Sequence, residues 1–385
     1  MPQRPPLHTR AGRFIRQPAG YSAFIPAPLP PNPPVEIDDE MLALVSRADR
    51  RLGRLDGSVQ TLPDADLFVL MYVRKEAVLS SQIEGTQSSL VDVLEAEAQI
   101  LDRARPADVD EVINYVGAMN HGLQRLSELP VSVRLIREIH HRLLTGVRGG
   151  EHQPGELRRS QNWIGPAGCT LQDAAFVPPP PDEVPRVLLE LERFMHSSEP
   201  LPALVEIGLA HAQFETIHPF LDGNGRVGRL LITFLLCERD IVREPVLYIS
   251  HHFKKHRERY YDTLQAIRDD GNWEDWLKFF LRGVAEVADE ATETARRIVD
   301  LRERHRALIV DRFGRVAGNG LRVLEQLYTT PIITVNGVAE VTGTSFTAAA
   351  ELMGRFVDND MLREVTGQAR NRRFRYDSYV RLFSG

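Results

Sequence analysis

The residues best suited to chemistry lie in one short run, from His218 to Arg229. The run reads HPFLDGNGRVGR and combines an imidazole, a carboxylate, three glycines and two arginines. An imidazole titrates near neutral pH and can serve as a general base. A carboxylate such as that of Asp222 is a hard oxygen ligand for magnesium beside phosphates. These residue types together indicate a site that handles a nucleotide.

The glycines and arginines of this run predict phosphate binding. Gly223 and Gly225 can adopt a left-handed backbone, which lets successive N–H groups converge on an anion. A helix predicted to begin near Arg226 points its positive end toward the same place. Arg226 and Arg229 are three residues apart and share one face of that helix, so both guanidinium groups can clamp phosphates.

The same glycines also match the dinucleotide pattern G-x-G-x-x-G, with Asp240 as the ribose partner. That pattern requires a preceding apolar strand within a βαβ unit. Residues 211–222 instead have helical spacing with a proline near their end, and no βαβ rhythm surrounds them. The sequence also has no G-K-[ST] element of a P-loop. The dinucleotide interpretation is therefore disfavoured.

The elements that must position this run are mostly helical. From Glu36, apolar residues recur at three- and four-residue steps over most of 250 residues, and the pattern runs to about His305. The main interruption, 146–181, is rich in Gly and Pro and predicts an extended flap or hairpin. Residues 18–34 contain seven prolines and predict an extended, polyproline-like arm that wraps a domain or stays mobile.

The last 85 residues have a different pattern. Three short helices are expected at 321–328, 335–341 and 345–357, followed by two strands within 362–376, and this order is typical of a winged helix. From Leu301 onward 13 Arg stand against 9 Asp plus Glu, so this segment is about +4 while the whole chain is −6. DNA contact, dimerisation and docking of a protein target are all open for it. Most of the excess charge lies at Arg370, Arg372, Arg373 and Arg375.

The run at His218–Arg229 resembles the Fic family signature, H-x-F-x-[DE]-G-N-G-R-x-x-R, at every specified position. The resemblance covers roughly residues 35–290, including Gln161–Gly165, which resembles the family's flap. It implies a mainly α fold: a compact helical bundle with a β-hairpin flap, to which the small C-terminal winged helix is added. The expected division is an arm at 1–35, an N-terminal helical region at 36–110, a catalytic core at 111–290, and a linker helix with the winged helix at 291–385.

The resemblance implies transfer of AMP from ATP to a Ser, Thr or Tyr hydroxyl of a protein target, which can include the chain itself. His218 would deprotonate that hydroxyl, Asp222 would bind Mg²⁺, and Arg229 would reach the γ-phosphate. Tyr260 would lie near the adenine, although a core tyrosine would look the same in the sequence. The residues expected to contact the nucleotide are Glu84, Asn162, Trp163, Ile164, Gly165, Asp222, Gly223, Asn224, Gly225, Arg226, Val227, Gly228, Arg229 and Tyr260.

A second motif, SSQIEG at Ser80–Gly85, resembles the family's inhibitory sequence [ST]-x-x-x-E-[GN]. Ser80 and Glu84 are one helical turn apart, and Gly85 suits the C-terminal cap of a helix. The resemblance implies that Glu84 pairs with Arg229 and displaces the γ-phosphate, so that the chain restrains its own activity. Taken alone, a motif this short would indicate only an ordinary solvated glutamate.

Several further residues allow two interpretations. Trp163 and Ile164 can offer a strand edge to a target's backbone, or Trp163 can pack on the bundle. His251, His252 and His256 suggest a metal site, because 252 and 256 are four residues apart, but the sequence supplies no third acidic or thiol ligand at a sensible spacing. Three neighbouring cations would also oppose a metal ion, so a basic face that is solvated or near the nucleotide is favoured. His140 and His211 are expected to be bundle residues. The three cations are Lys254, Lys255 and Arg257.

Composition limits the alternatives. With 385 residues, 43% of them hydrophobic and 26% charged, the chain is typical of a multidomain globular protein. Its net charge of −6 disfavours whole-chain binding to a polyanion. Two cysteines, the absence of an apolar leader in residues 1–17 and the lack of a long apolar stretch predict a cytoplasmic protein with no membrane partner. Removal of AMP, transfer of another nucleotide, a homodimer, and a DNA-binding regulator with a sensor core stay open.

Overall fold

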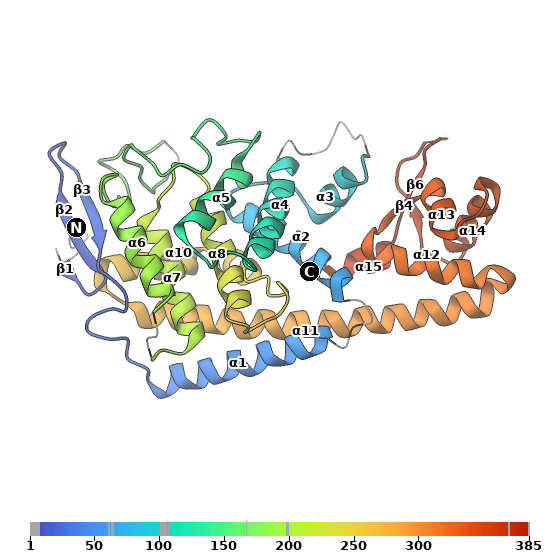
Figure 1. Ribbon diagram of the computed structural model, residues 1–385, viewed down its shortest axis with the longest axis horizontal. Helices are drawn as coiled ribbons and strands as arrows, with labels where there is room; N and C mark the ends of the chain where they lie inside the picture. Colours follow the sequence, from blue (N-terminus) through green and yellow to red (C-terminus); the bar gives the residue numbers. More distant parts are fainter. Residues whose placement is uncertain are drawn as a thin grey trace.

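The computed structural model describes residues 8–60, 62, 65–100, 106, 108–166, 168–197, 200–368 and 370–383. The molecule is elongated, and the helix α11 (Trp273–Arg312) runs along most of its length (Figure 1). Its 40 residues extend about 60 Å at 1.5 Å per residue. The helix α1 (Asp39–Gln60) packs along it through buried residues spaced by three and four, such as Met41, Leu44 and Ala48. The mainly α fold predicted from the sequence is confirmed.

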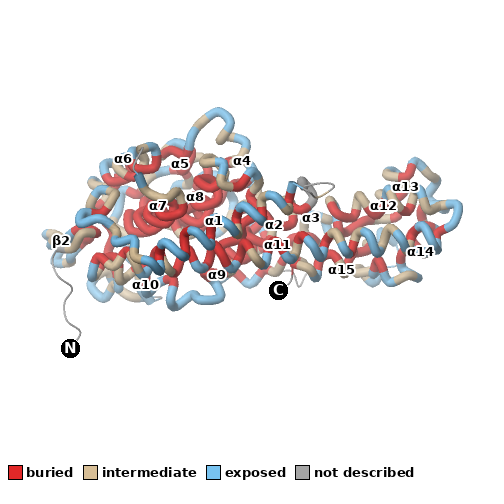
Figure 2. The backbone as a smooth tube through the Cα atoms, turned by 90° about the horizontal axis from the view of Figure 1, so that it is seen from below, coloured by how far each residue is buried: buried red, intermediate tan, exposed pale blue. Residues whose placement is uncertain are grey.

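The helical body surrounds two almost fully buried helices, α7 (Ala203–Ile217) and α8 (Asn224–Glu238). Both are apolar on nearly every side, which is the pattern of helices at the centre of a bundle. The red tubes at α7 and α8 in Figure 2 mark this centre. The surrounding helices are α2 (Ala65–Ile83), α3 (Leu90–Glu97), α4 (Val109–Arg125), α5 (Val133–Leu144), α6 (Val184–Met195), α9 (Ser250–Lys255) and α10 (Arg257–Asp270).

The N-terminal segment forms an antiparallel sheet, in the order β1 (His8–Thr9), β2 (Gly12–Arg16), β3 (Ser22–Pro26). The polyproline-like arm predicted for 18–34 is therefore wrong at β3. Phe24 explains the difference: it is fully buried against Phe176, with ring centroids 5.9 Å apart, and its N–H donates to the carbonyl of Val177 at 2.9 Å. Residues 1–7 of the arm lie outside the described residues.

The C-terminal segment contains α12 (Ala317–Thr329), α13 (Val335–Thr342) and α14 (Phe346–Asp358), close to the three predicted helices. Its sheet has the order β4 (Ile332–Thr334), β6 (Arg373–Arg375), β5 (Arg363–Glu364), in which β4 was not expected. The assignment of this segment as a winged helix stays a prediction. The domain limits proposed at 110 and 290 fall within α4 and α11, so neither coincides with a loop.

The end of the chain returns from the far tip to the helical body (Figure 1). In the last elements, α15 (Asp377–Val380) and a short 3₁₀ turn (Arg381–Phe383), the ring of Phe383 lies 5.3 Å from that of Tyr72 in α2. Arg375 also contacts α3 through an ion pair with Glu95, with an Nη1–Oε1 distance of 2.7 Å. The C-terminal segment thus contacts α2 and α3, two helices that precede the run His218–Arg229 in the chain. Over the described part of the chain, no helix has the length and apolarity needed to cross a membrane.

Candidate active site

The signature run forms the loop between the two central helices. His218 ends α7 in a left-handed conformation, with φ 49° and ψ 61°, and Gly223 is left-handed as well, with φ 77°. The helix α8 begins at Asn224, two residues before the predicted start at Arg226. The left-handed conformation expected of Gly225 is wrong, because this residue already belongs to the helix. A glycine is needed at this position because a side chain has no room: a Cβ there would lie 2.2 Å from Oε1 of Glu84.

The loop is held by side chains that bond its backbone. The amide of Asn224 pairs with the backbone N–H and C=O of Phe220, both at 2.8 Å. His140, on α5, stacks on the Phe220 ring with centroids 3.7 Å apart, and its Nε2 is 3.0 Å from the carbonyl of Asp222. Nδ1 of His140 accepts the Gly155 N–H, so His140 is a bonded bundle residue, as the sequence predicted.

Two residues at the base of the flap also fix the loop. Arg158 is 3% exposed, and its Nε donates to the carbonyl of His218 at 2.9 Å. The side-chain amide of Asn162 donates to the carbonyl of Phe220 at 2.8 Å. Asn162 belongs to the expected set, whereas Arg158 was missed because nothing in its local sequence distinguishes it from a surface arginine.

Burial and nearby positive charges keep the imidazole of His218 neutral at physiological pH. Burial lowers the pKa of its imidazole to about 4, and the positive charges of Arg268 and Arg158 act in the same direction. Nδ1 lies 3.4 Å from the carbonyl of Glu215, which leaves Nε2 as the free ring nitrogen when Nδ1 carries the hydrogen. A neutral imidazole at physiological pH can therefore take a proton from a hydroxyl placed next to it.

The pKa of His218 can be measured directly. In nucleotide-free protein we expect its imidazole to stay neutral as the pH falls through 6.5 and to titrate near 4, because burial and the two arginines disfavour the charged form. Histidine-labelled protein followed by NMR over this range reports the midpoint, and the spectrum of His218→Ala identifies the resonance. A midpoint near 6.5 would contradict the described environment.

Both signature arginines are buried and bound to acidic residues from the N-terminal helices. Arg226 and Arg229 are each 1% exposed. Arg226 pairs with Glu111 of α4 at 3.1 Å, a partner that sequence reasoning missed. Arg229 donates from Nε to the Ser80 hydroxyl at 2.8 Å and from Nη2 to the Ser80 carbonyl at 3.1 Å. The same Nη2 reaches Oε1 of Glu84 at 2.6 Å.

Glu84 follows the end of α2 and extends over the start of α8. Gly85, with φ 98°, ends the turn after the helix, and about a third of the Glu84 side chain, 33%, is exposed. Burial raises the pKa of this carboxyl, but the charge and hydrogen bond of Arg229 outweigh that effect and hold the pKa below its ordinary value. Glu84 is therefore ionised at neutral pH, and the predicted contact between it and Arg229 is present.

A second buried acid, Glu215, was not expected. Burial raises the pKa of Glu215 to about 7, against the charges of Arg229 and Arg268. Its Oε1 has no hydrogen-bond partner among the described residues. This oxygen faces Gly228, where a Cβ would lie 2.3 Å from it. Gly228, which occupies an unspecified position of the signature, thus makes room for a carboxyl group behind the loop.

This close approach predicts that Gly228→Ala is destabilising. The added methyl group would meet Glu215 and also the Phe214 ring, at 3.2 Å, with no exposed space to receive either. We expect a loss of about 1–3 kcal/mol in the free energy of unfolding, as in other overpacked cores. The control is Gly57→Ala on the exposed face of α1, where nothing lies within 4 Å and alanine should gain about 0.5–1 kcal/mol. Equal denaturant midpoints for the two variants would contradict the packing.

The remaining expected residues occupy three kinds of place. In the flap, Ile164 pairs antiparallel with Phe176 as an isolated bridge, and Trp163 is 42% exposed and so does not pack on the bundle. The Asp222 side chain is 40% exposed beside Arg226. Val227 is buried in the core. Tyr260 is 1% exposed, and its hydroxyl contacts Nε2 of His211 at 3.0 Å, so its place at the adenine stays a prediction.

This fold and loop define a class of protein. The N-terminal model of the Fic/DOC family matches residues 42–124, and the Fic/DOC family model matches residues 130–236, which include the loop. The chain belongs to the Fic/DOC family. The second match ends within α8 and begins just before α5.

Named relatives share about half of their length with this chain. Protein adenylyltransferase Fic of Aedes aegypti is 29% identical over 246 residues, covering 60% of this chain and 45% of that protein. The protein of the same name from Drosophila melanogaster is 28% identical over 258 residues, covering 64% and 48%. The chain thus spans about half the length of the curated relatives it matches.

Solved structures have the same fold at low identity. A Fic family protein from Desulfovibrio desulfuricans superposes with a TM-score of 0.59 at 18% identity, covering 89% of this chain and 97% of that one. A Fic domain containing signaling protein from Bacteroides thetaiotaomicron gives a TM-score of 0.51 at 19% identity, covering 65% and 97%. These likenesses concern the arrangement of the helices.

Proposed function

We propose that this protein transfers AMP from ATP to a hydroxyl side chain of a protein. The observation that carries the proposal is the convergence of a neutral imidazole and an exposed carboxylate on one loop with two buried arginines at the start of α8. The names of the relatives support the same activity. Phosphoryl and nucleotidyl transfer need positioning and neutralisation of charge more than covalent help from the protein, and these residue types supply both.

In the proposed reaction, His218 takes the proton of the target hydroxyl. The hydroxyl oxygen forms a bond to the α-phosphorus of ATP while the bond from that phosphorus to the bridging oxygen breaks, and pyrophosphate leaves. The N–H groups at the start of α8 and the guanidinium of Arg226 face the phosphates. Arg229 binds the γ-phosphate. The flap at Asn162–Gly165 aligns the target, with the exposed Trp163 available to it.

Magnesium fits the loop at Asp222. The carboxylate is 40% exposed, and its Oδ1 accepts the N–H of Gly223 at 2.6 Å, which leaves Oδ2 free for a hard cation. When bound there, Mg²⁺ would neutralise phosphate charge. The chain's own contribution is to hold the carboxylate toward solvent beside the start of α8, since Nε2 of His140 donates to the backbone carbonyl of Asp222.

We further propose that Glu84 restrains this activity. Its carboxylate accepts a hydrogen bond from Nη2 of Arg229, the group assigned to the γ-phosphate. The same carboxylate lies against Gly225. ATP would then bind with its triphosphate displaced, in poses where the α-phosphate is not aligned with the attacking oxygen.

The experiment that tests the function is transfer of label from ATP labelled in its α-phosphate into lysate proteins by the full chain. Label on protein, with none from γ-labelled ATP, supports AMP transfer. Parallel reactions with UTP and GTP show which nucleotide the protein transfers. Loss of label from premodified protein would indicate AMP removal instead. Protein label appearing only from γ-labelled ATP would contradict the proposal.

For the C-terminal segment we propose docking of a protein partner, either the target or a second copy of the chain. The excess positive charge predicted at 370–375 is smaller at the surface than the sequence suggested, because Arg375 is 9% exposed and pairs with Glu95 and Asp377. A DNA-binding role would rest on Arg370, Arg372 and Arg373. Salt-dependent binding of duplex DNA that disappears when these three are neutralised would favour DNA over docking. We also propose a cytoplasmic location.

A further inference from the structure

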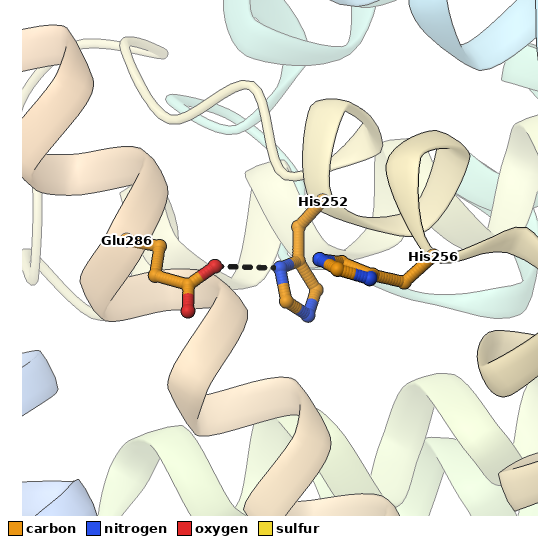
Figure 3. Close-up of side chains that lie close together, drawn as sticks. All are labelled: His252, His256 and Glu286. Carbon is orange, nitrogen blue, oxygen red and sulfur yellow. Dashed lines mark hydrogen bonds and ion pairs between the residues drawn. The ribbon is translucent and has the colours of Figure 1, made fainter.

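Three side chains outside the nucleotide site converge at the junction of α9, α10 and α11. His252 lies in α9, His256 lies between α9 and α10, and Glu286 comes from the middle of α11 (Figure 3). Each offers a ligand atom, and these atoms all lie within 4.8 Å of one another. The three elements therefore bring two imidazoles and a carboxylate to a single point.

The backbone holds the two histidines on one side of a single turn. The N–H of His256 donates to the carbonyl of His252 at 3.0 Å, and their rings are 4.7 Å apart. Glu286 faces them from α11, with Oε2 3.2 Å from Nδ1 of His252. The sequence did not reveal this third ligand because Glu286 follows His256 by 30 residues and belongs to another helix.

The His252 imidazole occupies a site built to receive a ring. It is 5% exposed and packs on Phe279, with ring centroids 4.6 Å apart. Gly283 provides the space, since a Cβ there would lie 2.5 Å from Cδ2 of the ring. Within the described part of the chain, Nε2 has no hydrogen-bond partner. The ring's polar contact is thus on the side of Glu286.

The neighbouring cations oppose a metal ion less than the sequence suggested. Nζ of Lys254 donates to the side chain of Gln82 at 2.6 Å, and the Arg257 guanidinium lies 5.6 Å from the centre of the Tyr261 ring. Lys255 is the remaining cation of the three.

We propose that His252, His256 and Glu286 bind a zinc ion. Two imidazoles and one carboxylate are a ligand set that suits Zn²⁺ better than Mg²⁺ or Ca²⁺, which prefer all-oxygen sites. Zinc takes the place of the hydrogen shared by His252 and Glu286, and water fills the fourth position, because His256 and Glu286 are at the surface. The ion joins the α9–α10 junction to α11 and stabilises that contact.

The test is calorimetric titration of the full chain with Zn²⁺ in excess Mg²⁺, which occupies hard oxygen sites such as Asp222 without competing for imidazole. We expect one zinc per chain. His256→Gln and Glu286→Gln should each weaken zinc binding at least about tenfold, the lower limit seen even for outer partners of metal ligands. Zinc should also raise the thermal midpoint of the wild type and not that of the two variants. Both variants change surface side chains, so the folded state is retained.

The matched control is His251→Gln, which removes the adjacent histidine, paired with Glu290 at 3.4 Å. This variant should bind zinc as the wild type does. Co²⁺ provides a second readout, since visible absorption of a four-coordinate ion should appear in the wild type and be lost in Glu286→Gln. The proposal is overturned if no zinc binds, if His256→Gln and Glu286→Gln bind it with wild-type affinity, or if His251→Gln weakens it equally.

Discussion

His218→Ala is expected to abolish AMP transfer while ATP affinity stays within a few-fold of the wild type. In the proposed reaction the imidazole acts on the target hydroxyl and contributes little to holding the triphosphate, which would face the arginines and the start of α8. Loss of a general base costs about 10²–10⁴-fold in rate. The rate of labelling with α-labelled ATP and nucleotide affinity by calorimetry give the two quantities separately.

A surface histidine provides the control for this variant. The His152 side chain is 44% exposed and pairs with Glu151 at 3.5 Å, so His152→Ala should label at the wild-type rate. Residual transfer by His218→Ala within tenfold of the wild type would remove the imidazole from the mechanism. Loss of ATP binding in parallel with loss of rate would instead indicate a collapsed loop.

Glu84→Gly is expected to increase transfer strongly, because it frees Arg229 for the γ-phosphate. A hydrogen bond between charged groups contributes about 1.5–3 kcal/mol. At about 1.4 kcal/mol per tenfold, the rate should rise roughly tenfold to more than a hundredfold. The initial rate of labelling at saturating ATP and Mg²⁺ is the measurement.

Two further variants separate this explanation from a general loosening of the fold. Arg229→Ala in the Glu84→Gly background should lose the gain, since the γ-phosphate then has no partner at that position. Glu97→Gly removes a different acid that pairs with an arginine, Arg74, at the surface, and should leave the rate unchanged. A rate for Glu84→Gly equal to that of the wild type would return Glu84 to an ordinary glutamate at a helix end.

The sequence predicted best where the determinants are local. The run from His218 to Arg229 is contiguous, and its spacing alone places the imidazole, the carboxylate and the arginines within twelve residues. The helical periodicity also predicted the body, because an amphipathic pattern reports one buried face whatever lies against it. The strand at Ser22–Pro26 was missed because the prolines of segment 18–34 suggested an arm, whereas Phe24 requires a buried partner.

The partners of these groups could not be predicted in the same way. Glu111 meets Arg226 from 115 positions earlier in the chain, and Arg158 meets the carbonyl of His218 from 60 positions away. Neither residue stands in a distinguishing local pattern, because the sequence around a buried charged residue need not differ from that around an exposed one. Glu286 and His256 illustrate the same limit, because helix packing alone brings them together.

The contacts of Ser80 with Arg229 have a consequence for the restraint that we propose for Glu84. Nε and Nη2 of the guanidinium are both anchored on Ser80, independently of the carboxylate. A free arginine side chain would lose about 1.5–2 kcal/mol of rotamer entropy on being ordered. Here that loss has already occurred in the folded protein, so departure of Glu84 leaves a rigid, correctly oriented donor. The transition between the two states then requires movement of one short side chain and no rearrangement of the receiving group.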